Sequence, residues 1–76
     1  MRKLGYYLHK TSNGYLLVKI INPKRIPKLY SKVFNSKWDF IGYLIDIIGP
    51  VHGPYAVIKP VKDIEPSPHE PMYYKR

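Results

Sequence analysis

Residues 40–60 read FIGYLIDIIGPVHGPYAVIKP, and the rest of the chain can be placed around them. The first nine of these residues are apolar at seven positions and rich in β-branched and aromatic side chains, which favours a buried strand. Gly-Pro pairs follow at 49–50 and 53–54. They predict turns, because glycine permits unusual backbone angles while proline fixes φ and lacks an amide donor. Residues 55–59 then predict a second strand, which ends at Pro60.

Strict alternation along residues 40–48 would place apolar side chains on both faces of this strand. The two sets are Phe40, Leu44 and Ile48 on one face, and Ile41, Tyr43, Ile45 and Ile47 on the other. In so small an antiparallel protein, one face meets the core and the other would normally meet water. The second face therefore needs a cover, which is either the rest of a closed barrel or another protein.

Three further strands are expected before this stretch. The strand-like runs 4–10 and 15–21 are separated by a turn that ends in Asn13-Gly14, a pair typical of hairpins because both residues tolerate positive φ. On the second run, Leu16, Val18 and Ile20 form the candidate core face. Residues 22–31 contain two prolines among basic residues and predict an extended loop. Residues 32–35 then predict a short strand.

The chain after Pro60 is rich in proline. Pro66, Pro68 and Pro71 lie within six residues and predict an extended path across the surface. We therefore assign residues 1–65 to the barrel domain and residues 66–76 to a proline-rich C-terminal segment, in which residues 72–74 are a candidate edge strand. Five or six short strands with tight turns and no significant helix predict an all-β fold, a small antiparallel β-barrel.

Charge is unevenly distributed along the 76 residues. Thirteen Lys and Arg face five acids, a formal net charge of +8, yet Asp46 is the single charge in residues 40–55. Basic ends around an apolar middle favour a domain that binds protein through its middle and lies near RNA. A solvated basic surface without a partner is the alternative. Without an apolar run of roughly 20 residues or a signal peptide, we expect a cytoplasmic protein with no membrane contact.

The residues that carry catalysis are few and scattered. There is no cysteine, the three histidines lie far apart, and no glycine-rich loop precedes a helix. We therefore expect no enzymatic activity, no cofactor and no metal. Eight tyrosines are the unusual abundance. Tyr6, Tyr7 and Tyr15, interleaved with basic residues, would suit base stacking in a free-standing RNA- or single-strand-binding barrel, and tyrosine suits a protein interface equally well.

The central stretch resembles the core motif of a known family. The residues that carry the resemblance are Ile41-Gly42, Leu44, Asp46-Ile47, Gly49-Pro50, Tyr55, Val57 and Lys59, preceded by Pro27 and Val33-Phe34-Asn35. In this order they are similar to the Gar family, the small non-catalytic subunit of the box H/ACA ribonucleoproteins that make pseudouridine. The short length without Gly-Arg-rich tails resembles archaeal members.

The resemblance implies a six-stranded barrel and an accessory role. Such a subunit docks as a monomer on the catalytic domain of the pseudouridine synthase subunit and contacts guide RNA only indirectly or weakly. It promotes substrate loading, turnover and release in rRNA pseudouridylation, and so contributes to rRNA processing and ribosome biogenesis. A translation-factor-like barrel acting alone is a further alternative.

These arguments give two sets of predicted site residues. The predicted contacts to the protein partner are Ile41, Gly42, Tyr43, Ile47, Gly49, Pro50, Tyr55 and Val57. The residues predicted to lie nearest to RNA are Lys24, Arg25, Lys28 and Lys32.

Overall fold

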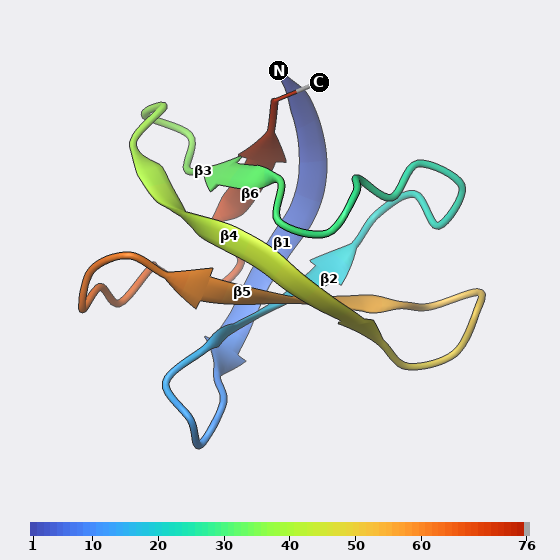
Figure 1. Ribbon diagram of the computed structural model, residues 1–76, viewed down its shortest axis with the longest axis horizontal. Coiled ribbons are helices and arrows are strands. Elements are labelled where there is room, and N and C mark those ends of the chain that lie inside the picture. Colours follow the sequence, from blue (N-terminus) through green and yellow to red (C-terminus); the bar gives the residue numbers. More distant parts are fainter. Residues whose placement is uncertain (76) are drawn as a thin grey trace.

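Six antiparallel strands close into a barrel in the computed structural model, which describes residues 1–75 (Figure 1). The strands are β1 (Arg2–Lys10), β2 (Leu16–Ile20), β3 (Lys32–Phe34), β4 (Phe40–Ile48), β5 (Tyr55–Pro60) and β6 (Pro71–Tyr74). Their order around the barrel is β1-β2-β5-β4-β3-β6, and β6 pairs again with β1. The predicted all-β, six-stranded antiparallel barrel is confirmed. Nowhere in residues 1–75 is there a helix long and apolar enough to cross a membrane.

Apolar side chains from every strand fill the interior. The predicted core face of β2, formed by Leu16, Val18 and Ile20, is confirmed, since all three side chains are buried. No polar or charged residue of the described chain is fully buried. The barrel is therefore held by packing and by its closed hydrogen-bond ladder, which leaves no open sheet edge.

Two bulges in β4 set which of its side chains face the core. Against β3 the pairing skips Ile41, and against β5 it skips Ile45. Each extra residue interrupts the alternation of inward and outward side chains. As a result Ile41, Leu44 and Ile47 belong to or pack on the core, whereas Phe40, Tyr43, Asp46 and Ile48 face outward. The assignment of faces by strict alternation is therefore wrong.

Glycine follows an extra residue at equivalent places on the two longest strands. Leu4 on β1 and Ile41 on β4 are the skipped residues, and Gly5 and Gly42 come next. A β-carbon on Gly5 would overlap the backbone carbonyl of Lys19, and one on Gly42 would overlap that of Lys59. Only glycine permits this close approach, which lets both strands coil tightly enough for six strands to close.

The C-terminal strand is an integral part of the barrel. β6 pairs with both β1 and β3, and the Met72 side chain is 0% exposed within the core. The preceding residues are also held, because the Tyr7 amide donates to the Glu70 carbonyl and the His69 amide donates to the Tyr7 carbonyl, each at 2.9 Å. The strand predicted at residues 72–74 is therefore present, but it is not an edge strand, because β6 pairs on both sides and closes the cylinder beyond the predicted boundary at residue 65 (Figure 1). Arg76 lies outside the described residues.

Candidate protein-interaction face on the β4–β5 hairpin

The outward side chains of β4 and β5 form one continuous surface. In the β4–β5 register, Tyr43 pairs with Lys59, Asp46 with Val57 and Ile48 with Tyr55. Partners in register have side chains on the same face of the sheet. We call these six residues, together with the connecting loop 49–54, the hairpin face.

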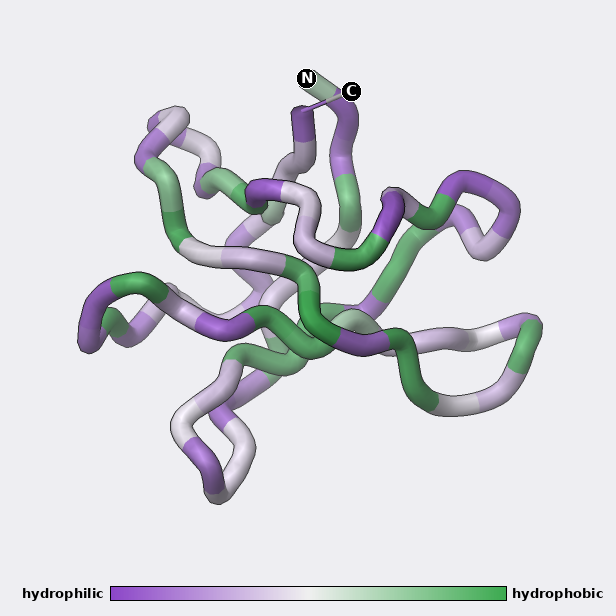
Figure 2. The backbone as a smooth tube through the Cα atoms, in the orientation of Figure 1, coloured by the Kyte–Doolittle hydropathy of each residue, from purple (hydrophilic) through white to green (hydrophobic). Residues whose placement is uncertain are grey.

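The hairpin face is largely apolar although it faces outward. Ile48 and Tyr43 are exposed, and Val51 at the loop tip is more exposed still. Val57 is only 9% exposed even though it lies outside the core cluster, between the inward residues Ala56 and Ile58. Neighbouring outer side chains therefore cover Val57, and the surface is packed. Figure 2 shows hydrophobic colour in the second half of β4, broken by one hydrophilic position, and a further hydrophobic stretch at the tip of the loop.

Backbone geometry fixes the loop that joins the two strands. Gly49 has φ of 91°, a left-handed conformation that other residues adopt at a cost. The Gly53 amide donates to the Pro50 carbonyl at 3.1 Å and closes a turn. Tyr55 packs on Gly49, because a β-carbon there would lie 3.0 Å from Cδ2 of the ring. The Gly-Pro loop is thus held against the start of β5.

Aromatic contacts extend the face toward β3. The ring centroids of Phe40 and Tyr43 lie 5.2 Å apart in an edge-on arrangement, and those of Phe34 and Phe40 lie 5.8 Å apart. Lys32 Nζ lies 5.5 Å from the centroid of Phe40. Such contacts stabilise the fold beyond the effect of burying apolar area, and they hold Tyr43 in a defined position.

The structure divides the predicted partner contacts into two groups. Tyr43, Gly49, Pro50 and Tyr55 lie on the hairpin face, and their contact with a partner stays a prediction. Ile41 and Gly42 are buried, Ile47 packs on the core, and Val57 is covered; these four predicted contacts are corrected for that reason. For the three residues of β4, the two bulges explain the burial, because they turn Ile41, Gly42 and Ile47 inward.

Sequence reasoning missed the exposed apolar residues Ile48 and Val51. A signal for Ile48 was present in the apolar run itself. Asp46 is charged and must face water in a barrel this small, so alternation from Asp46 places Ile47 inward and Ile48 outward. Val51 follows a Gly-Pro turn, and its exposure comes from the loop geometry alone.

The residues predicted to lie nearest to RNA are found at different places on the surface. Arg25 and Lys28 line a groove with other cationic side chains, whereas Lys32 lies against Phe40. The Lys24 amide donates to the Asn22 side-chain oxygen at 3.1 Å, within the turn that precedes this groove. Of the tyrosines predicted to stack on bases, Tyr7 is only 2% exposed and faces the core, so that assignment is wrong.

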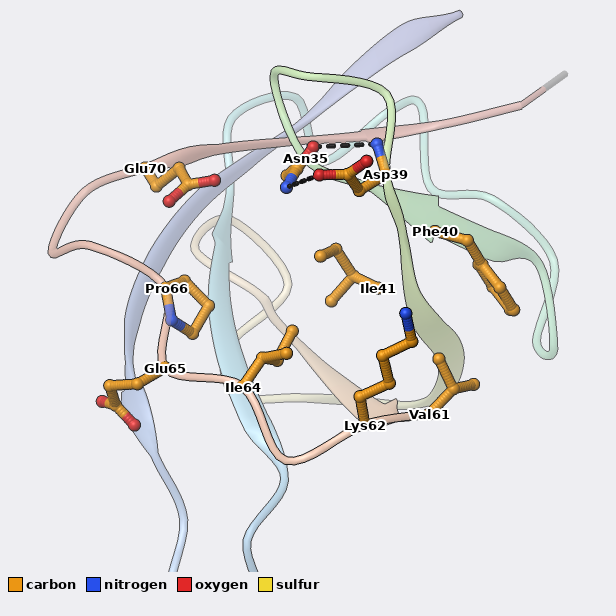
Figure 3. Close-up of a pocket in the computed structure, with 10 residues that line it drawn as sticks. All are labelled: Asn35, Asp39, Phe40, Ile41, Val61, Lys62, Ile64, Glu65, Pro66 and Glu70. Atoms are coloured by element: carbon orange, nitrogen blue, oxygen red, sulfur yellow. Dashed lines mark hydrogen bonds between the residues drawn. The ribbon is translucent and has the colours of Figure 1, made fainter.

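A second depression, of about 500 Å³, gathers acidic side chains (Figure 3). Asp39, Glu65 and Glu70 line it, beside the apolar Ile41 and Ile64. The Asp39 carboxylate accepts a hydrogen bond from the Asn35 side chain at 3.3 Å. Within residues 1–75 no group of three or more His, Cys, Asp or Glu side chains is placed to hold a metal ion. The absence of enzymatic activity stays a prediction.

The acids near this depression are engaged by neighbours from β1. Tyr7 donates its hydroxyl to Glu65 Oε1 at 3.2 Å, and Lys10 Nζ lies 3.3 Å from oxygens of both Asp63 and Glu65. Burial, followed by the hydrogen bond to Glu65, raises the pKa of Tyr7. Burial opposes the charged form of Lys10, but the hydrogen bonds from its ammonium to Asp63 and Glu65 outweigh that effect and raise its pKa. These contacts tie the segment after β5 to β1, which is a structural role.

Fold and surface together define a small closed β-barrel with an apolar, nearly uncharged outer face on one hairpin. No family model matches the chain. It is 47% identical over 62 residues to an uncharacterized protein of Methanocaldococcus jannaschii, covering 79% of this chain and 70% of that protein. It is 34% identical over 70 residues to an uncharacterized protein of Methanothermobacter thermautotrophicus, covering 92% of this chain and 73% of that protein. The chain belongs to the same family as these two archaeal proteins.

Proposed function

We propose that this protein is a non-catalytic subunit of an archaeal box H/ACA ribonucleoprotein that binds the pseudouridine synthase subunit through the hairpin face. The observation that carries the proposal is the exposure of Ile48, Tyr43 and Val51 on a hairpin whose only acidic side chain is Asp46. The chain as a whole has a net charge of +8, but this hairpin carries few charges. The resemblance of residues 41–59 to the Gar motif supplies the identity of the partner.

The composition of the hairpin face matches the centre of a protein interface. Interface centres are depleted of charge and enriched in aromatic residues, with a charged rim. Here Tyr43 and Tyr55 are the aromatic anchors, Ile48 lies opposite Tyr55 next to the loop, and Lys59 provides a charge at the edge. The contacts of Tyr55 with Gly49 and of Tyr43 with Phe40 hold these anchors in place before binding, which lowers the entropic cost of association.

The proposed role is to assist a catalytic partner. Docked as a monomer on the synthase in the cytoplasm, the barrel would promote substrate loading, turnover and product release in rRNA pseudouridylation. A non-catalytic role is supported by the acidic residues. The carboxylates of Asp39, Asp63 and Glu65 bind neighbouring side chains of the same barrel, which is a structural use of these groups. Guide RNA would be contacted only indirectly or weakly.

A reconstitution assay tests the proposal. Synthase and guide RNA are incubated with excess substrate RNA, with and without this protein, and pseudouridine is measured over several turnovers. We expect a higher multiple-turnover rate with the protein present, and no pseudouridine from the protein alone. If binding to the synthase is demonstrated and the rate stays the same, the accessory role is overturned.

A further inference from the structure

Three basic segments that are far apart in sequence converge on one groove. The groove has a volume of about 470 Å³, and its cationic side chains are Arg2 at the start of β1, Arg25 and Lys28 in the β2–β3 loop, and Lys75 after β6. Ile26 and Tyr74 contribute apolar surface, and none of the lining residues is acidic. The closure of β1 against β6 pairs Arg2 with Tyr74, the residue before Lys75, and the start of β1 and the end of β6 lie close together in Figure 1.

The β2–β3 loop that supplies two of these cations is folded into turns. The Arg25 amide donates to the Asn22 carbonyl at 3.0 Å, and the Ser31 hydroxyl donates to the Lys28 carbonyl at 2.6 Å. The Ser31 carbonyl in turn accepts from the Leu44 amide of β4 at 3.0 Å. The backbone of Arg25 and Lys28 is therefore fixed to the barrel, which reduces the entropy lost when a ligand binds.

No acidic side chain of residues 1–75 forms an ion pair with a cation of the groove. In residues 1–75 the ion pairs are both made by Lys10, with Asp63 and Glu65. Asp39, Glu65 and Glu70 line the separate acidic depression, which shares no residue with the groove. Four cations without acidic partners attract a polyanion, and the regular phosphates of a nucleic acid are the polyanion that several positive charges along one groove would follow.

Two aromatic rings in contact, those of the half-buried Tyr73 on the outer face of β6 and of Trp38 in the β3–β4 turn, lie close to the groove in sequence terms, one residue along β6 from Tyr74. Tyr73 precedes the groove residue Tyr74, and its ring centroid lies 5.1 Å from that of Trp38, edge to face. The Trp38 side chain is exposed. Lys3 pairs in register with Tyr73 and holds its ammonium 4.4 Å from the centroid of Tyr6. Proteins that bind single strands combine basic side chains, which hold the phosphates, with aromatic rings, on which unpaired bases stack.

We propose that this groove binds the phosphate backbone of a single-stranded nucleic acid, with bases stacking on Trp38 and Tyr73. The site uses no residue of the hairpin face. Binding of a single-stranded nucleic acid and binding of the synthase are therefore separate properties. If one proposal fails its test, the other is unaffected.

Fluorescence anisotropy with labelled 12-nucleotide oligo(U), oligo(dT) and a duplex of equal length tests the site. The full chain is titrated over a salt series, beside the double variants Arg2→Gln/Lys75→Gln and Arg25→Gln/Lys28→Gln. The matched control is Lys19→Gln/Lys62→Gln, which removes the same charge from exposed positions outside the groove. Trp38→Ala tests stacking, and thermal melting checks that each variant is folded.

We expect each groove double variant to weaken single-strand binding about tenfold and to flatten the dependence of log affinity on log salt by about 1.4, since each lost phosphate contact removes about 0.7. The control should change affinity less than threefold, and Trp38→Ala should weaken it about fivefold or more. Similar affinity for RNA and DNA supports a site that binds phosphates and stacks on bases of either nucleic acid. Tighter binding of oligo(U) than of oligo(dT) would identify the ligand as RNA. Equal losses in groove and control variants, or a duplex bound as tightly as the single strands, would overturn the proposal.

Discussion

The ring of Tyr55 packs directly on Gly49, with its Cδ2 atom 3.0 Å from where a β-carbon of residue 49 would lie. This contact joins the start of β5 to the Gly-Pro loop. Since Gly49 also has φ of 91°, residue 49 has to be glycine both for its backbone angle and for the space beside it. The aromatic anchor of the hairpin face therefore depends on the local backbone of the turn.

Gly49→Ala is expected to destabilise the barrel by about 1–2 kcal/mol from the backbone angle, and further because the ring of Tyr55 has to move. Gly14→Ala is the matched control, since Gly14 has a similar φ of 84° and open space around its α-carbon. Urea unfolding of both variants gives the comparison. Equal losses at the two positions would show that the Tyr55 contact adds nothing.

Removal of residues 66–76 is expected to abolish cooperative unfolding, because β6 closes the barrel and Met72 is fully buried. Met72→Ala in the full chain should cost about 2–5 kcal/mol, as other truncations of buried long side chains do. Circular dichroism and chemical denaturation measure both effects. A truncated chain that still unfolds in one sharp transition would restore a domain boundary near residue 65.

The raised pKa of Tyr7 predicts a loss of stability at alkaline pH. The folded state holds the phenol proton more tightly than the unfolded chain, whose tyrosine pKa is about 10. The stabilisation is therefore complete below pH 10 and is lost as pH rises through the raised pKa of the folded state. In Tyr7→Phe the free energy of unfolding should therefore fall less between neutral and alkaline pH. At neutral pH the same variant should cost about 0.5–1.5 kcal/mol, because its hydrogen bond to Glu65 is gone.

Unfolding free energies at pH 8 and pH 11 check this effect. Tyr30→Phe is the control, because the Tyr30 side chain is 71% exposed. An unchanged pH dependence in Tyr7→Phe would remove Tyr7 from the alkaline transition. It would then point to other groups that titrate in this range, including Lys10, whose raised pKa acts in the same direction.

The fold class could be predicted from the sequence, but the exact binding face could not. Asn13-Gly14, the Gly-Pro pairs and the alternation of Leu16, Val18 and Ile20 are local signals, and local signals identify strands and turns. The bulge at Ile41 lies in the pairing of β4 with β3 and the bulge at Ile45 in its pairing with β5, and pairing between distant segments has no local signal. The convergence of Arg2, Arg25, Lys28 and Lys75 likewise needs the closure of β1 against β6, which the proline-rich segment concealed.

Ile47→Glu would give an ambiguous result as a test of the proposed interface. Its side chain packs on the core, so a charge there is expected to unfold the barrel whether or not the hairpin face binds a partner. A charge at residue 48 avoids this difficulty, because Ile48 faces outward. Val61→Glu is the matched control, since both side chains are 43% exposed and Val61 lies outside the hairpin face.

The affinity of Ile48→Glu for the pseudouridine synthase, compared with that of Val61→Glu, tests the central proposal most directly. Both variants should melt close to the wild-type temperature. A charge at the centre of an interface costs at least about 2 kcal/mol, so Ile48→Glu should bind about thirtyfold or more weakly, while Val61→Glu should bind as wild type does. If folded Ile48→Glu binds the synthase as tightly as the wild-type protein, the hairpin face is not the interface.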